Sequence, residues 1–252
     1  MSRKIAIITG ASRGLGKSTA LNLAAQGVDI IGTYQSRQAD AEAVVAEIQA
    51  LGGKAHMLQL DVGRSDSFDA FADQLRGVLK DVFGAEHFDF LVNNAGTGIY
   101  NSIAETTETQ FDQLVNIHFK GPFFLTQKLL PLIADGGRII NLSSGLARFS
   151  MVGYAAYASM KGAIEVWTRY LAQELGPRGI NVNVLAPGAI ATDFGGGTVR
   201  DNPEVNKMIA SSTALGRVGE ADDIGSAISM LLGDGGKWIN GQRIEASGGI
   251  FL

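Results

Sequence analysis

The sequence predicts an α/β protein in which seven parallel strands form one doubly wound sheet with helices on both faces. Short runs of Val, Ile and Leu alternate along the 252 residues with longer segments whose apolar residues recur at helical spacing. The runs are continuously apolar, which is typical of strands buried on both faces, as in a parallel sheet. There is no linker and no internal repeat, so we expect a single domain over residues 1–252.

The order of the elements follows from these patterns. The first strand, over residues 5–9, leads through a glycine-rich turn into a helix over 14–26 that ends at Gly27. Further helices are expected over 41–51, 68–82, 155–175 and 222–232, and another begins at the capping box of residues 107–110. Pro122 should kink or restart that helix. The other strands are expected at 30–34, 56–60, 88–92, 138–142, 180–185 and 238–245.

One long segment has no clear period. Residues 186 to about 218 are rich in Gly, Thr and Asn, and residues 195–197 are three consecutive glycines. A long loop in a compact domain is usually functional, and glycines give it conformational freedom. We therefore expect a substrate loop over about 188–218, with a mobile cover around 195–197.

Composition excludes several classes of protein. With 46% hydrophobic and 18% charged residues, the chain is too apolar to be disordered. It has no cysteine for disulfides or thiolate sites, and its three histidines lack ligand spacing, so we expect no metal. A net charge of −4 at pH 7 argues against nucleic acid as a partner. No run is long enough for a membrane span or signal peptide, so we expect a soluble, cytoplasmic protein without membrane partners.

The turn after the first strand predicts a phosphate-binding loop. Glycines spaced G-x-x-x-G-x-G allow a tight turn and let a pyrophosphate approach the backbone and the following helix N-terminus. An ordinary tight turn is the alternative, but the position at the first strand–helix junction favours a dinucleotide. The residues of this turn are Gly10, Ser12, Arg13, Gly14, Leu15 and Gly16.

The end of the second strand favours NADP(H) over NAD(H). An NAD site usually has a carboxylate there, and an NADP site has a basic residue instead. Here the strand ends at Tyr34 and continues into Ser36 and Arg37, with no carboxylate. Arg37 and Arg13 could both bind a 2′-phosphate through charge-assisted hydrogen bonds. The alternative is that both are solvated surface arginines.

A tyrosine and a lysine one helical turn apart predict acid–base chemistry. Tyr157 and Lys161 stand at i and i+4, so they lie on one face of the expected helix. A nearby ammonium group favours the phenolate and lowers the pKa of the phenol toward working pH, as general acid–base catalysis requires. Such a pair alone is common by chance. Tyr154 has no such partner, because Ala158 stands four residues after it.

These features together resemble the short-chain dehydrogenase/reductase family over essentially the whole chain. The pattern is most similar to the 3-oxoacyl-[acyl-carrier-protein] reductases and related carbonyl reductases. The resemblance implies a Rossmann fold and an NADP(H)-dependent oxidoreductase that transfers a hydride between nicotinamide and a ketone or secondary alcohol. The matching residues, in the family's order and spacing, are 9–16, Asn93-Asn94-Ala95-Gly96, Asn116, Ser144, Tyr157/Lys161 and Pro187-Gly188.

The resemblance also implies roles for individual residues. Tyr157 would protonate the carbonyl oxygen, and Lys161 would lower its pKa and bind the nicotinamide ribose. Ser144 would hydrogen-bond the substrate carbonyl; Ser143 is its rival, but the family's offset to the tyrosine selects Ser144, and strand alternation points the two apart. Asn116 would hold a water that relays protons through Lys161, or would be a bonded polar residue without chemistry.

Further cofactor contacts are implied at the carboxyl ends of the strands, where doubly wound folds bind ligands. Asp61 and Val62 would contact the adenine, Asn94, Ala95 and Gly96 the adenosine ribose side, and Ile190 and Thr192, after Pro187 and Gly188, the nicotinamide carboxamide. The expected pocket walls are largely apolar, and a hydrophobic ketone, a 3-oxoacyl thioester or a sugar would fit the same catalytic set.

Two other functions stay open at this point. One is an NAD(P)-dependent alcohol or sugar dehydrogenase. The other is a dinucleotide-sensing regulatory protein without turnover, although such proteins typically lose the tyrosine or the lysine. The resemblance further implies a homotetramer, or alternatively a homodimer, that forms through the helices around 109–132 and 157–175 and through the C-terminal strand.

Overall fold

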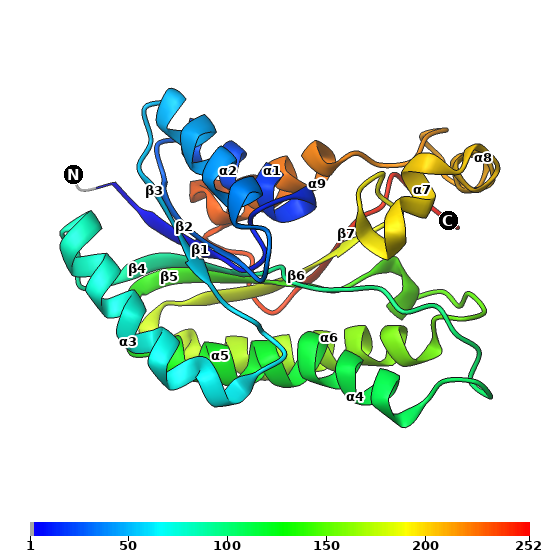
Figure 1. Cartoon of the computed structure of the whole chain (residues 1–252), viewed down its shortest axis with the longest axis horizontal. Helices are drawn as coiled ribbons and strands as arrows, with labels where there is room; N and C mark the ends of the chain where they lie inside the picture. Colours follow the sequence, from blue (N-terminus) through cyan, green and yellow to red (C-terminus); the bar gives the residue numbers. More distant parts are fainter. Residues whose placement is uncertain (1–2) are drawn as a thin grey trace.

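Seven parallel strands form one sheet in the order β3-β2-β1-β4-β5-β6-β7 (Figure 1). The structure is a computed structural model that describes residues 3–252, so residues 1–2 of the expected domain lie outside the described residues. Because β4 returns to the other side of β1, the direction of winding reverses between these two strands. The strands are β1 (Ile5–Ile8), β2 (Asp29–Tyr34), β3 (Ala55–Gln59), β4 (Phe88–Asn93), β5 (Ile133–Leu142), β6 (Asn181–Pro187) and β7 (Arg243–Ala246).

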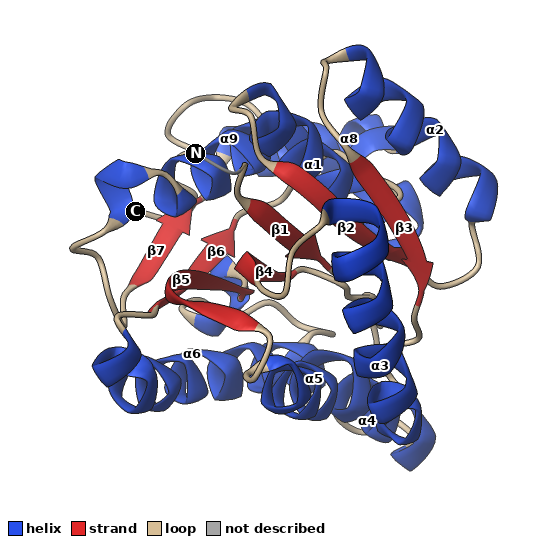
Figure 2. Ribbon diagram, turned by 90° about the vertical axis from the view of Figure 1, so that its left-hand side faces the viewer, coloured by secondary structure: helices blue, strands red, loops and turns tan. Residues whose placement is uncertain are grey.

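Helices cover both faces of the sheet, as the sequence predicts (Figure 2). Ile7 belongs to the hydrophobic core on the side of α3, α5 and α6, whereas its neighbour Ile8 belongs to the core on the side of α1, α2 and α9. This alternation is what a strand buried on both faces requires. The helices are α1 (Gly14–Ala25), α2 (Gln38–Ala50), α3 (Phe68–Val78), α4 (Glu108–Val115), α5 (Gly121–Leu129), α6 (Ala155–Leu175), α7 (Thr198–Asp201), α8 (Pro203–Ser211) and α9 (Ala221–Leu232).

The expected capping box and the expected restart at Pro122 are both confirmed. The Thr107 hydroxyl accepts a hydrogen bond from the Gln110 backbone, and the Gln110 side chain accepts one from the Thr107 backbone. After α4 the chain makes a wide π-type turn at Asn116–Lys120, and α5 then begins with Pro122 in its first turn. This wide turn sets which side chains of residues 116–120 face the sheet.

Two sequence-based expectations are wrong. The last strand begins at Arg243 rather than at residue 238; Trp238 is 95% exposed and lies outside the sheet. The segment 186–218 is not a loop throughout, because it contains α7 and α8. Asn202 caps α8 through its side-chain oxygen, and Pro203 follows at the first helical position, so the local sequence does carry a helix-start signal.

The segment with α7 and α8 is held at the carboxyl edge of the sheet, next to the C-terminus (Figure 1). One bridge joins Ile190 to Gly219 at the base of the segment, and another joins Thr213 to Ile250 of the C-terminal tail. Residues 195–197 all have positive φ, a conformation that glycine adopts without strain. Within residues 3–252, no helix is long and apolar enough to cross a membrane.

Candidate active site

A cavity of about 670 Å³ opens at the carboxyl edge of the sheet, above the point where the winding reverses. It brings together all but two of the predicted catalytic and cofactor-binding residues. Asn116 and Gly16 are not among its lining residues. Lining it are Gly10, Ser12, Arg13, Gly14, Leu15, Tyr34, Ser36, Arg37, Asp61, Val62, Asn94, Ala95, Gly96, Ser144, Tyr157, Lys161, Pro187, Gly188, Ile190 and Thr192.

The glycine-rich turn forms one wall of the cavity. Gly10 has a φ of +67°, and a Cβ at this position would stand 3.0 Å from the Cα of Ala95. A Cβ on Gly16 would stand 2.2 Å from the Gly10 carbonyl oxygen, so this glycine allows α1 to pack close beneath the turn. Arg13 precedes α1 and makes no side-chain cap, which leaves the first N–H groups of the helix to a ligand.

Two arginines lie together at one end of the cavity. Arg13 comes from the glycine-rich turn, and Arg37 follows β2 and directly precedes α2. Both guanidinium groups face Asp193, at 2.9 Å from Arg13 Nη1 and 3.9 Å from Arg37 Nη1. Two guanidinium groups suit this end of the cavity to an anion. The end of β2 also lacks the carboxylate that an NAD site usually has there.

The opposite end of the cavity holds the tyrosine–lysine pair. Tyr157 and Lys161 are 7% and 6% exposed on α6, and the Lys161 Nζ lies 5.5 Å from the centre of the Tyr157 ring. That ammonium donates to the Leu142 carbonyl at 2.8 Å. The two serines point apart, as expected: Ser144 accepts from the Leu146 backbone at 3.2 Å, whereas Ser143 donates to Glu165 at 2.6 Å.

Burial is the main cause of the pKa shifts of both Tyr157 and Lys161. It raises the pKa of Tyr157 above its usual value of 10.0, and a hydrogen bond with Ser144 acts in the opposite direction. Burial also lowers the pKa of Lys161 to about 7. Burial therefore outweighs the other effects on the phenol, and the expectation that Lys161 lowers the pKa of Tyr157 stays a prediction.

His118 is the residue of the site that the sequence-based reasoning missed. Its ring stacks edge-to-face on Tyr157 at 5.1 Å and lines the cavity, and its Nε2 donates to the Thr97 carbonyl at 2.7 Å. Burial, followed by the charge of Lys161, lowers the pKa of His118 to about 3, so the imidazole is neutral. No spacing signal marks it, since its direction depends on the wide turn at Asn116–Lys120.

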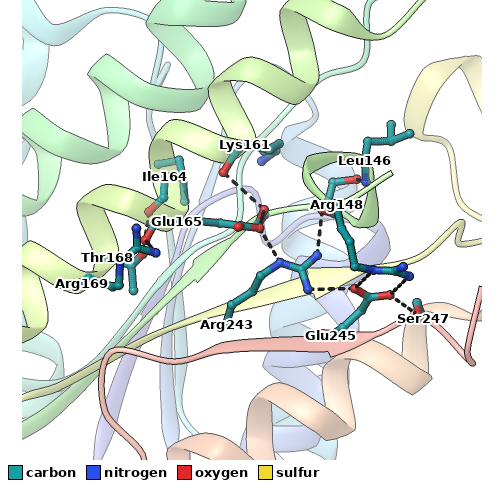
Figure 3. Close-up of polar contacts among 12 residues, drawn as sticks. Leu146, Arg148, Lys161, Ile164, Glu165, Thr168, Arg169, Arg243, Glu245 and Ser247 are labelled. Atoms are coloured by element: carbon teal, nitrogen blue, oxygen red, sulfur yellow. Dashed lines mark hydrogen bonds and ion pairs between the residues drawn. The ribbon is translucent and has the colours of Figure 1, made fainter. Parts of the chain in front are cut away.

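An ion-pair chain supports the catalytic end from below (Figure 3). Glu165 accepts from the Ser143 hydroxyl and pairs with Arg243 of β7 at 2.7 Å. Arg243 also reaches the Ser144 carbonyl at 3.5 Å. The chain thus connects α6 and β7 to the strand end that carries both serines.

The same chain continues to the C-terminal tail. Arg243 shares Glu245 with Arg148, which binds that carboxylate through two nitrogens. These bonds, with Arg148 contributing most, hold the pKa of Glu245 at about 2. Arg148 also donates to the carbonyls of Ile250 and Phe251, two residues that line the cavity. The walls of the cavity and its catalytic end are therefore parts of one network.

Among residues 3–252, there is no group of three or more His, Asp or Glu side chains placed to hold a metal ion.

The buried lysine predicts a pH-dependent stability. Between about pH 7 and the usual lysine pKa of 10.5, the folded protein binds fewer protons than the unfolded chain, so its free energy of unfolding rises with pH. Lys161→Met removes this titration. The melting temperature of the wild type should therefore rise relative to that of Lys161→Met between about pH 7 and about pH 9.5.

Thermal unfolding followed by circular dichroism measures this difference. Lys237→Met is the matched control, because Lys237 is exposed and should not reproduce the trend. A difference between the wild type and Lys161→Met that stays constant with pH contradicts the prediction.

Comparison with known proteins identifies the family. A family model described as enoyl-(acyl carrier protein) reductase matches residues 10–250. The 3-oxoacyl-[acyl-carrier-protein] reductase of Staphylococcus aureus is 36% identical, over 99% of this chain and 98% of its own. The promiscuous reductase LugOII, which catalyses a keto-reduction in lugdunomycin biosynthesis, is 39% identical with a TM-score of 0.93, over 98% and 97% of the two chains. A short chain dehydrogenase from Burkholderia cenocepacia in complex with NADP is 34% identical with a TM-score of 0.89, over 98% of both chains. This chain belongs to the short-chain dehydrogenase/reductase family.

Proposed function

We propose that the protein is an NADP(H)-dependent carbonyl reductase. The observation that carries the proposal is that one cavity is lined both by Tyr157, Lys161 and Ser144 and by Arg13 and Arg37, which follow strands on the other side of the point where the winding reverses. A dinucleotide needs an anion site at its phosphates and an acid–base group at its nicotinamide. The Burkholderia relative that is solved with NADP and the keto-reduction by LugOII support the same function.

The residues of the anion end fit NADP(H). Gly10 leaves room for a ligand against the backbone, the start of α1 offers free N–H groups, and Arg13 and Arg37 offer two guanidinium groups for a 2′-phosphate. The end of β2 has no carboxylate to bind a free ribose hydroxyl in its place. When bound, NADPH supplies the hydride, and the remaining cofactor contacts are those that the family resemblance assigns.

The residues of the catalytic end supply the proton. The raised pKa keeps the Tyr157 phenol protonated at neutral pH, so it can donate its proton to a carbonyl oxygen as charge builds there. Ser144 would hydrogen-bond the same oxygen and stabilise that charge. The ammonium of Lys161, 5.5 Å from the ring centre, would stabilise the phenolate that remains. Asn116 stays a proposed member of a proton relay, on the family resemblance alone.

The walls of the cavity favour an apolar ketone. Around Tyr157 they include Phe149, Met151, Phe194 and Met208. Arg148, the basic residue closest to this wall in sequence, is already paired with Glu245 and is not free for an acidic substrate. A hydrophobic ketone or a 3-oxoacyl chain is therefore the proposed substrate class.

A substrate screen with NADPH and NADH tests the function. Loss of the NADPH absorbance is expected with hydrophobic ketones or 3-oxoacyl thioesters, and not with sugars or enoyl thioesters. Tyr157→Phe should lower kcat by at least about a hundredfold, because it removes the acid and keeps the ring. Tyr170→Phe, on the exposed side of the same helix, is the matched control and should keep full activity, because it also keeps the ring that a subunit contact would use.

Turnover that survives Tyr157→Phe contradicts the assigned acid. Tight binding of NADPH without reduction of any carbonyl supports the regulatory alternative. Reduction of enoyl thioesters alone contradicts the carbonyl reductase.

The proposal includes a cytoplasmic homotetramer, with a homodimer as the alternative. Large apolar side chains are exposed on the helices that the family resemblance assigns to the interface. Phe111 on α4 and Phe124 on α5 are 43% and 38% exposed, and Val166 and Tyr170 on α6 are 47% and 67% exposed. Burying such a surface between subunits is favourable. Sedimentation velocity at micromolar concentration should report a tetramer, and a monomer contradicts this part of the proposal.

A further inference from the structure

Asp193 lies among three guanidinium groups at the anion end of the cavity. Arg13 donates to its Oδ2 at 2.9 Å, Arg37 approaches the same oxygen at 3.9 Å, and Arg200 bonds to Oδ1. All four side chains line a polar cavity of about 560 Å³ that adjoins the main one. The carboxylate therefore sits where the two sequence-predicted phosphate ligands converge.

The contacts around Asp193 show that it is the common partner of the cluster. Arg37 has a second carboxylate in Asp40, at 3.4 Å, and Arg200 has one in Asp201, through two nitrogens. Only Asp193, among the described residues, makes an ion pair with Arg13. Arg200 and Arg13 hold the pKa of Asp193 below its usual range, so the group is an anion at neutral pH.

We propose that Asp193 is a specificity-determining residue whose carboxylate competes with the 2′-phosphate of NADP(H) for Arg13 and Arg37, and that Arg200 is a third ligand of that phosphate. The inference rests on the proposed function, because it concerns the same cofactor. A 2′-phosphate carries more negative charge than a carboxylate and offers three acceptor oxygens, so it satisfies several guanidinium groups better. NAD(H) has a neutral hydroxyl at this position and does not displace Asp193.

The exposure of the cluster makes this exchange feasible. The side chains of Arg13, Arg37 and Arg200 are 48–55% exposed and that of Asp193 is 35% exposed. Ion pairs in such positions are weak and screened by salt, so an incoming dianion can replace them. A buried pair in the same place would instead resist exchange.

The exchange is also connected to the catalytic end. Asp193 directly precedes Phe194, whose ring lies 5.8 Å from that of Tyr157. Residues 195–197 follow with positive φ, a conformation that glycine adopts without strain. Asp193 thus joins the anion site to the segment that packs near Tyr157.

The experiment compares Asp193→Asn with Asp201→Asn. Asp201→Asn removes the same charge from the same segment and touches Arg200, but it leaves the contacts of Arg13 and Arg37 with Asp193 intact. Dissociation constants are measured by isothermal titration for NADPH, NADH and 2′,5′-ADP. Asp193→Asn should bind NADPH and 2′,5′-ADP roughly three- to tenfold more tightly than the wild type. Its affinity for NADH should stay within about twofold, and Asp201→Asn should have the smaller effect on NADPH.

Three results with the variants would overturn the inference, and one result with the wild-type protein would contradict the proposed function. NADPH affinity that is unchanged or weaker in Asp193→Asn overturns the inference, as does an equal gain for NADH. An equal gain in Asp201→Asn also overturns it, because net charge rather than the contact would then be responsible. Wild-type protein that binds neither NADPH nor 2′,5′-ADP contradicts the proposed function itself, and this is seen before any variant is compared.

Arg200 is tested separately in the wild-type background. Arg200→Gln should weaken 2′,5′-ADP binding at least about threefold, because it removes a charged phosphate ligand, and it should leave NADH binding unchanged. If binding of 2′,5′-ADP is unchanged in this variant, Arg200 is not a ligand of the phosphate.

Discussion

The hydrogen bonds between Thr9 and Asn94 tie the loops after β1 and β4 to each other, and the site depends on them. The Thr9 hydroxyl accepts from the backbone N–H groups of Asn94 and Ala95, both at 3.0 Å. The Asn94 amide donates to the carbonyls of Thr9 and Gly10 at 2.8 and 3.1 Å. These strands flank the point where the winding reverses, so a parallel sheet must open a crevice there. The bonds fix the shape of that crevice and hold the glycine-rich turn that faces it.

From this edge outward, the cavity offers two different environments. At one end, arginines are about half exposed and exchange partners easily. At the other, Tyr157, Lys161 and His118 are almost fully buried, and desolvation moves all three pKa values toward the neutral forms. A ligand that spans the cavity would place its charged group at the solvent-exposed arginines and its reacting group at the buried residues. Hydrogen bonds and charges have their greatest effect on a transition state in such a buried environment.

Local patterns predicted much of this structure. The capping box at Thr107, the restart at Pro122 and the face shared by Tyr157 and Lys161 each depend on a few neighbouring residues, and each is found in the structure. The helix α8 also carries a local signal in Asn202 and Pro203, which the glycines before it obscured. The contacts that the sequence did not predict are long-range. Arg13 meets Asp193 across 180 residues and Arg243 meets Glu165 across 78, and the direction of His118 depends on a wide turn. No periodicity encodes such contacts.

A crystal structure with NADP⁺ bound tests this assignment of the cavity most directly. We expect the 2′-phosphate within hydrogen-bond distance of Arg13 and Arg37, the pyrophosphate against the start of α1, and the nicotinamide beside Tyr157. A cofactor that lies in the cavity with its 2′-phosphate in solvent, or with its nicotinamide away from Tyr157, would contradict it.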